Sequence, residues 1–191
     1  MKIKILILLS SSVMFSCQRA KETPEILFDV DRLIDSQVVS LMQAGASLTK
    51  AASIDEASDN ATFVPDSAGW ANELEVFRHL DVINRSIYED AYDITSVKDT
   101  NSNLMVRVLK ARRPIPVTTF KVFYQDDPDK VRKIEASFSE ENALYYTARE
   151  FSLELDEYQG QMILSGYTVR GIQKMILRDT VNFSISSKVI Y

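Results

Sequence analysis

The chain of 191 residues contains one cysteine, one histidine and five glycines, and each of these shortages excludes a class of site. Zinc sites of the Cys/His type, nucleophilic Cys/His pairs and two-histidine metal motifs all need more cysteine or histidine than the sequence has. There is also no glycine-rich phosphate loop and no Gly-x-Ser-x-Gly nucleophile elbow. From these patterns the sequence predicts no catalytic residue, no cofactor and no metal ligand.

Carboxylates are the one kind of catalytic group that the composition leaves open. The 27 acidic residues exceed the 22 basic ones, which gives a net charge of −5 and disfavours nucleic acid as a partner. A pair of carboxylates can cleave a glycosidic bond, but no spacing in this sequence singles out two of them. The run Asp126-Asp127-Pro128-Asp129 lacks the glycine and the distal glutamate of a calcium loop and is typical of an acidic turn.

Cys17 closes a short apolar segment at the start of the chain. Lys2 and Lys4 precede most of this segment, and Ser16 stands directly before the cysteine. The run is too short to cross a bilayer as a helix, which takes roughly 20 apolar residues, and serines interrupt it. Because there is no second cysteine, no disulfide can form within the chain, and packing alone must stabilise the fold.

This N-terminal segment resembles the signal peptide of bacterial lipoproteins, in which a small residue precedes an obligatory cysteine. Ser16 fits that pattern, whereas Met14 and Phe15 are bulkier than the usual residues. The resemblance implies cleavage before Cys17 and acylation of the cysteine with two or three chains, such as palmitate, which is enough for stable membrane anchoring. Gln18 is not the aspartate that retains many lipoproteins at the inner membrane, so the resemblance implies the outer membrane. The alternative is an ordinary secretory signal with a chance cysteine near its end.

The sequence then divides into a signal peptide at 1–16, a polar tether at 17–24 and a single domain at 25–191. Removal of the first 16 residues from 191 leaves 175, and the loss of Lys2 and Lys4 takes the net charge from −5 to −7. A chain of this length buries about 70% of its unfolded surface, which is ample for one core.

Two amphipathic helices are predicted in the first half of the domain. The first starts near Pro24 and ends at Gly45, with apolar residues on one stripe: Leu27, Val30, Ile34, Val38 and Leu41. The second follows the N-cap candidates at 65–67 and buries Trp70, Leu74, Phe77 and Leu80. His79 is half a turn from Trp70, so it is expected in solvent and without a catalytic role. A hairpin is expected between the helices, at 46–64.

From Tyr92 onward the apolar pattern has a period of two, which is typical of strands. The strand candidates are 104–109, 117–124, 131–138, 144–155, 161–177 and 181–191, and short connections between them indicate an antiparallel meander. Two candidates are longer than a usual domain is wide, so we expect them to bend, with a bulge near 149–150 and curvature at Gly166 and Gly171. The predicted fold is α+β: two N-terminal helices packed on a strongly curved meander, as in a half-barrel.

Two functional hypotheses follow. The first is a non-enzymatic, lipid-anchored envelope lipoprotein that binds an apolar ligand or a partner protein in a cleft between helices and sheet. The second is a hydrolase of an envelope polymer that uses a carboxylate pair. Tyr145, Tyr146, Tyr158 and Tyr167 suit a binding surface, although tyrosine is also common in sheets. The layout resembles uncharacterised small lipoproteins of Gram-negative envelopes, a resemblance that does not specify function.

Overall fold

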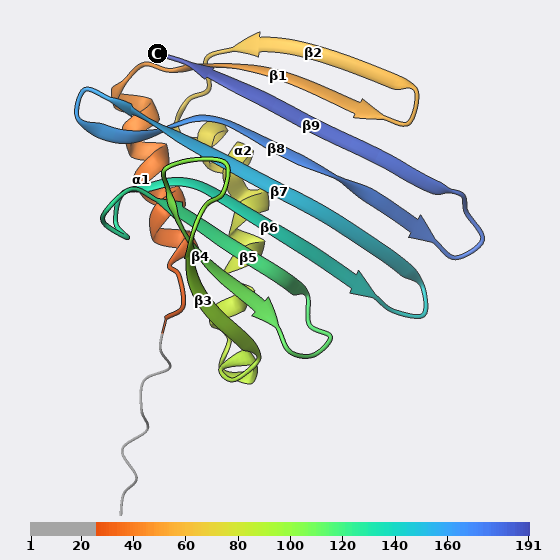
Figure 1. The fold of residues 1–191 in the computed structure, drawn as a ribbon. Helices are drawn as coiled ribbons and strands as arrows, with labels where there is room; N and C mark the ends of the chain where they lie inside the picture. The colour runs from red at the N-terminus through yellow and green to blue at the C-terminus, as the bar shows by residue number, and fades with distance from the viewer. Residues whose placement is uncertain (1–25) are drawn as a thin grey trace, which may run out of the picture.

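The computed structural model describes residues 26–191 (Figure 1), so Cys17, the predicted signal peptide and the predicted tether lie outside the described residues. The elements, in chain order, are α1 (Val30–Gln43), β1 (Ser47–Ile54), β2 (Ala57–Phe63), α2 (Ser67–Arg78), the 3-10 helices η1 (His79–Asn84) and η2 (Ser86–Tyr88), β3 (Tyr92–Lys98), β4 (Met105–Ala111), β5 (Val117–Tyr124), β6 (Val131–Glu141), β7 (Tyr145–Tyr158), β8 (Gln161–Met175) and β9 (Thr180–Ile190). No helix in this part of the chain is both long enough and apolar enough to cross a membrane.

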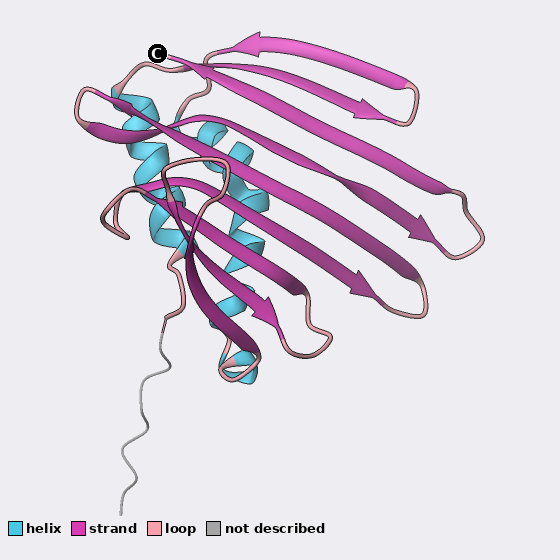
Figure 2. Cartoon of the chain, viewed as in Figure 1, coloured by secondary structure: helices cyan, strands magenta, loops and turns pink. Residues whose placement is uncertain are grey.

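All the strands belong to one antiparallel sheet of nine, in the order β2-β1-β9-β8-β7-β6-β5-β4-β3. Strands β4 to β9 correspond to the six strand candidates of the predicted meander, and β3 precedes them as a strand that was not among those candidates. The early hairpin joins the same sheet because β9 returns beside β1, with Leu48 opposite Val189 and Ile54 opposite Phe183. Both α-helices lie on the same face of the sheet (Figure 2).

An aspartate caps the start of each α-helix. Asp29 accepts a hydrogen bond from the backbone N–H of Arg32, and Asp66 accepts one from Gly69. The predicted start of the second helix is therefore confirmed, whereas the first helix begins at Val30 rather than near Pro24. The earlier start was wrong because the Asp29 side chain supplies the cap that satisfies the first free N–H groups.

Large side chains fill the space between the helices and the sheet. Trp70, Leu74 and Phe77 of α2 are buried, as their spacing predicted. Phe77 packs edge-on against the rings of Phe151 and Tyr167 in the sheet. This packing removes the apolar face of each helix from water and provides the main stabilisation of the two-layer arrangement.

The predicted fold class was wrong. The molecule is mainly an antiparallel sheet with two α-helices among the described residues, and the sheet is neither closed nor strongly curled into a half-barrel. The expected bulge near 149–150 is absent from the β7–β8 ladder, whose register shifts between Glu154 and Leu155 instead. Gly166 and Gly171 permit close approach rather than curvature, since a Cβ at Gly171 would lie 2.1 Å from the carbonyl oxygen of Ala148.

The long strands stay extended because each pairs with an equally long neighbour. β7 and β8 remain in register from Tyr145 opposite Met175 to Tyr158 opposite Gln161, apart from the single shift. As a result the sheet runs past the helices, and its turns β6–β7, β8–β9 and β1–β2 project at the right of Figure 1 with no helix beside them. We call this end of the sheet, residues 52–59, 138–150 and 170–184, the overhang.

Candidate functional site

The tip of the overhang carries four exposed apolar side chains, which we call the apolar rim: Leu144, Met175, Ile176 and Leu177. Their exposed fractions are 66%, 49%, 59% and 99% respectively. The two turns that carry them are joined by a hydrogen bond of 2.8 Å from the N–H of Ile176 to the carbonyl oxygen of Leu144. Leu177 has a φ of +60°, a conformation that a bulky branched residue rarely adopts. The fold therefore holds apolar groups in water at a fixed place.

Beside the rim, on the face of the sheet that the helices cover further along, lies a shallow pocket of about 270 Å³. It is lined by His79, Phe138, Glu140, Tyr145, Thr147, Arg149 and Gln173, and we call it the Arg149 pocket. The strand register places these side chains together, because Arg149 lies opposite Phe138 of β6 and Thr147 lies between Glu140 and Gln173. Successive residues of a strand alternate between faces, so all of these strand residues point to the helix side.

Arg149 is the most distinctive residue of this pocket. It is half-buried, it makes no ion pair with any residue that the structure describes, and its Nε is buried without a hydrogen-bond partner. Its guanidinium carbon lies 6.0 Å from the centre of the Phe183 ring, across Gly171, which separates the two residues in the ladder. The pKa of the neighbouring Tyr145 is raised, chiefly by its hydrogen bond with Glu140.

His79 is exposed, as expected, but it also lies at the edge of the Arg149 pocket, which the sequence could not indicate. It is exposed at the end of α2, as the helical spacing predicted. The fold nevertheless brings it to the edge of the Arg149 pocket, next to residues more than 50 positions away along the chain. Helix periodicity shows which face a residue occupies but not which strand lies opposite it.

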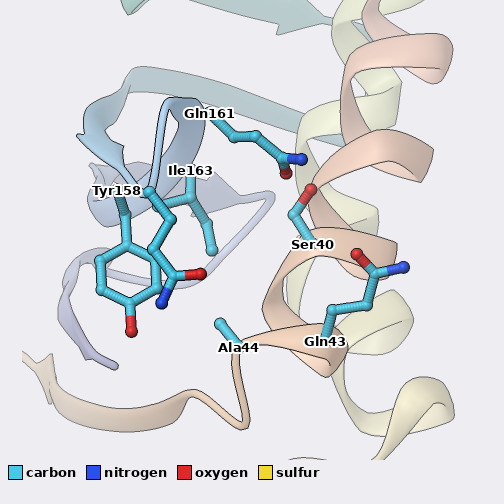
Figure 3. A pocket seen from close by; sticks show the side chains of 7 residues that line it. Ser40, Gln43, Ala44, Tyr158, Gln161 and Ile163 are labelled. Atoms are coloured by element: carbon cyan, nitrogen blue, oxygen red, sulfur yellow. The ribbon is translucent and has the colours of Figure 1, made fainter.

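A second pocket, of about 220 Å³, lies at the end of α1 (Figure 3). Ser40, Gln43 and Ala44 of the helix face Tyr158, Gln159, Gln161 and Ile163 of the β7–β8 turn. Figure 3 shows the side chains of Gln161 and Ser40 pointing toward each other across this space. The lining has no charged side chain, so it offers only weak polar contacts to a ligand.

The open face of the sheet holds two carboxylates in one depression of about 250 Å³, Glu135 and Glu150. Burial would raise the pKa of Glu135, but its contacts with Lys133 and Lys121, at 2.9 and 3.3 Å, lower it below its usual value. Glu150 accepts a hydrogen bond of 2.8 Å from Ser137. A glycosidase acid needs a raised pKa, and Glu135 has the opposite shift.

The tyrosines considered from the sequence are not brought together. Tyr167 is buried, and its hydroxyl donates to Glu73, which forms an ion pair of 2.6 Å with Lys50. Tyr158 packs against Tyr191 with ring centres 4.4 Å apart. Only Tyr145 lies in the Arg149 pocket, since Tyr146 points to the opposite face.

No protein-family model, curated protein or solved structure matches this chain. Residues 26–191 contain no group of three or more His, Cys, Asp or Glu side chains arranged to hold a metal ion. Fold and geometry define a mainly β protein whose most unusual feature is the overhang, with its apolar rim and the adjoining Arg149 pocket.

Proposed function

We propose that this chain is a lipid-anchored protein of the bacterial envelope that has no enzymatic activity and binds a partner protein through the overhang. The observation that carries the proposal is the apolar rim, in which two turns hold four large apolar side chains in water. Single exposed apolar residues are ordinary on protein surfaces, but several gathered at one tip of the molecule are a candidate interaction site.

A partner protein suits this surface better than a small apolar ligand. Small ligands bind in concave pockets that enclose most of their surface. Here the space between helices and sheet is occupied by Trp70, Leu74 and Phe77, and the rim projects from the edge of the sheet. A protein surface can cover a projecting apolar edge and surround it with polar contacts.

The alternative function, hydrolysis of an envelope polymer, has less support. It needs one carboxylate that stays protonated near neutral pH beside one that is ionised. In the depression that contains Glu135 and Glu150, two lysines lower the pKa of Glu135, so that group is an ionised partner in a surface ion-pair network.

The membrane part of the proposal comes from the N-terminal sequence. The lipoprotein-type segment that ends at Cys17 supports acylation of this cysteine, and Gln18 supports delivery to the outer membrane. A partner would then be another envelope protein, on the periplasmic or the external side.

Site-specific photo-crosslinking in cells tests the partner. We would place p-benzoylphenylalanine at Leu177 and, as a control, at Val39 on α1, which is also exposed (55%) but lies away from the overhang. We expect discrete crosslinked species at position 177 only, and their loss when Ile176→Glu adds a charge to the rim. Equal crosslinking at both positions, or crosslinking at 177 that Ile176→Glu leaves unchanged, would contradict the proposal.

A further inference from the structure

Arg149 differs from most partly buried cations among the described residues: like Arg107 it has no ion pair, and it alone has a buried side-chain nitrogen without a hydrogen-bond partner. Arg78 contacts Asp31 and Asp35, and Lys133 contacts Glu135 and Glu154. Arg149 has no carboxylate within ion-pair distance among the described residues, although the chain has five more acidic than basic side chains. Partial removal of a guanidinium from water is costly when no anion compensates for it. The guanidinium of Arg149 is therefore a positive charge that a bound anion could neutralise.

The surroundings of Arg149 fix its orientation. Its guanidinium lies over the ring of Phe183, and Gly171 between them leaves room for this contact because it has no side chain. An arginine held in this way loses little further freedom when it binds an anion, and its planar group matches a carboxylate. Gln173 and His79 line the same pocket and can add donors.

We propose that the Arg149 pocket binds a carboxylate from the partner's polypeptide, a glutamate or aspartate in an extended segment that also reaches the apolar rim. This inference rests on the proposed function. A carboxylate is favoured over a phosphate because Glu140 lines the same pocket, and its negative charge repels a dianion more than a monoanion.

The spacing of the surface defines the segment further. Arg149 lies opposite Gly171 of β8, and Met175 of the rim is four residues further along β8 on the same face. Four residues of a strand span about 13 Å. An extended segment with an acidic residue and a large apolar residue four positions apart therefore reaches both places at once, with the acid on Arg149 and the apolar residue on Met175.

Peptide titration followed by NMR tests this assignment. The protein would be the full chain carrying Cys17→Ser, and the probes would be the capped peptides Ser-Glu-Ser-Ser-Ser-Leu-Ser and Ser-Gln-Ser-Ser-Ser-Leu-Ser, with inorganic phosphate as a third. We expect the glutamate peptide to shift the Nε–H signal of Arg149. Replacing glutamate by glutamine should weaken binding about tenfold, in keeping with the loss of a charged hydrogen bond.

Variants separate the role of Arg149 from general charge. Arg149→Gln should remove the preference for the glutamate peptide, and Arg149→Lys should reduce it because the bidentate geometry is lost. Lys174→Gln is the matched control, since Lys174 is exposed on the opposite face of the neighbouring strand β8. It should leave affinity within about twofold, because exposed charges interact weakly through water.

Several results would overturn the inference: equal affinity for the two peptides, no binding of either at about 10 mM, tighter binding of phosphate, or an unchanged preference in both Arg149 variants. These failures differ from failure of the proposed function. If crosslinking at Leu177 persists while the two peptides bind equally, the rim binds a partner and the carboxylate assignment is wrong. If crosslinking at Leu177 is absent, the proposed function itself is wrong.

Discussion

Trp70 is the largest fully buried side chain, with an exposed fraction of 0%, and it joins α2 to the core against the sheet. Trp70→Ala should lower the free energy of unfolding by about 3 to 5 kcal/mol, because it removes a large apolar group and leaves a cavity. Urea denaturation provides the measurement. As the control, Val39→Ala, at an exposed position of α1, should change the free energy of unfolding by less than about 0.5 kcal/mol. A loss under about 1 kcal/mol for Trp70→Ala would show that Trp70 contributes little to the packing of the core.

Tyr92 gives the fold a measurable dependence on alkaline pH. Its ring is buried, its hydroxyl donates to the carbonyl oxygen of Val117 at 3.0 Å, and burial raises its pKa to about 12. Since the folded state holds this proton more tightly than the unfolded chain, the stabilisation is fully present below about pH 10. It is lost as pH rises from about 10 to about 12, and amounts to about 2 to 3 kcal/mol.

Comparison of wild type with Tyr92→Phe isolates this effect from the titration of lysines. At neutral pH the variant should be less stable by about 1 kcal/mol, because one hydrogen bond is lost. Between about pH 10 and about pH 12 its free energy of unfolding should fall less steeply than that of the wild type. Urea denaturation over that range gives both curves, and parallel curves would show that Tyr92 does not titrate as described.

Gln37 attaches the first helix to the sheet. Its side-chain amide donates to the carbonyl oxygen of Met162 at 3.1 Å and accepts from the N–H of Leu164 at 2.8 Å, next to the point where the β7–β8 register shifts. Gln37→Ala leaves the buried N–H of Leu164 and the partly buried carbonyl of Met162 without this partner, and the buried group alone costs about 1 to 3 kcal/mol. Gln43→Ala, at an exposed position of α1, is the matched control and should be nearly neutral.

Hydrogen exchange at Leu164 measures the same contact directly. We expect faster exchange of this amide in Gln37→Ala than in wild type, while amides in the middle of β6 keep their protection. Unchanged exchange at Leu164, together with unchanged stability, would show that α1 is held only by its apolar stripe.

The elements that local chemistry determines were predictable. Alternating apolar residues located the strands of the meander, and Asp66 marked the start of α2. The shape of the sheet was not predictable in this way, because whether a long strand bends depends on its neighbours. β7 and β8 match each other over nearly their full length, so both stay extended instead of curling.

The residues of the candidate site could not be recognised from the sequence, for a related reason. The Arg149 pocket takes residues from the end of α2 and from β6, β7 and β8, and no short motif spans that set. Arg149 follows an alanine in a strand with an ordinary alternating pattern, so nothing in the sequence shows that it lacks a carboxylate partner. An unpaired charge is a property of the assembled surface, and only register and packing reveal it.

The position of the whole molecule follows from its proposed anchor. Val30, the first residue of α1, is thirteen positions after Cys17, and a fully extended chain over that distance spans at most about 45 Å. The overhang lies at the far side of the sheet from the end of the chain that leads into α1 (Figure 1). A domain tethered in this way can turn its rim away from the lipid surface toward a neighbouring protein, which is consistent with a docking role.

Anchoring through Cys17 makes a prediction about the whole molecule that is independent of the overhang. In this proposal, acylation at Cys17 would supply the apolar chains that hold the protein in the bilayer. No helix among residues 26–191 is both long and apolar enough to cross a membrane. Cys17→Ser should therefore move the protein from the membrane fraction to the soluble fraction of the envelope, whereas the wild type should resist alkaline and high-salt washing. Ile176→Glu is the control for attachment through the rim and should leave fractionation unchanged. If Cys17→Ser still sediments with membranes after washing, the protein is held by something other than lipid on this cysteine.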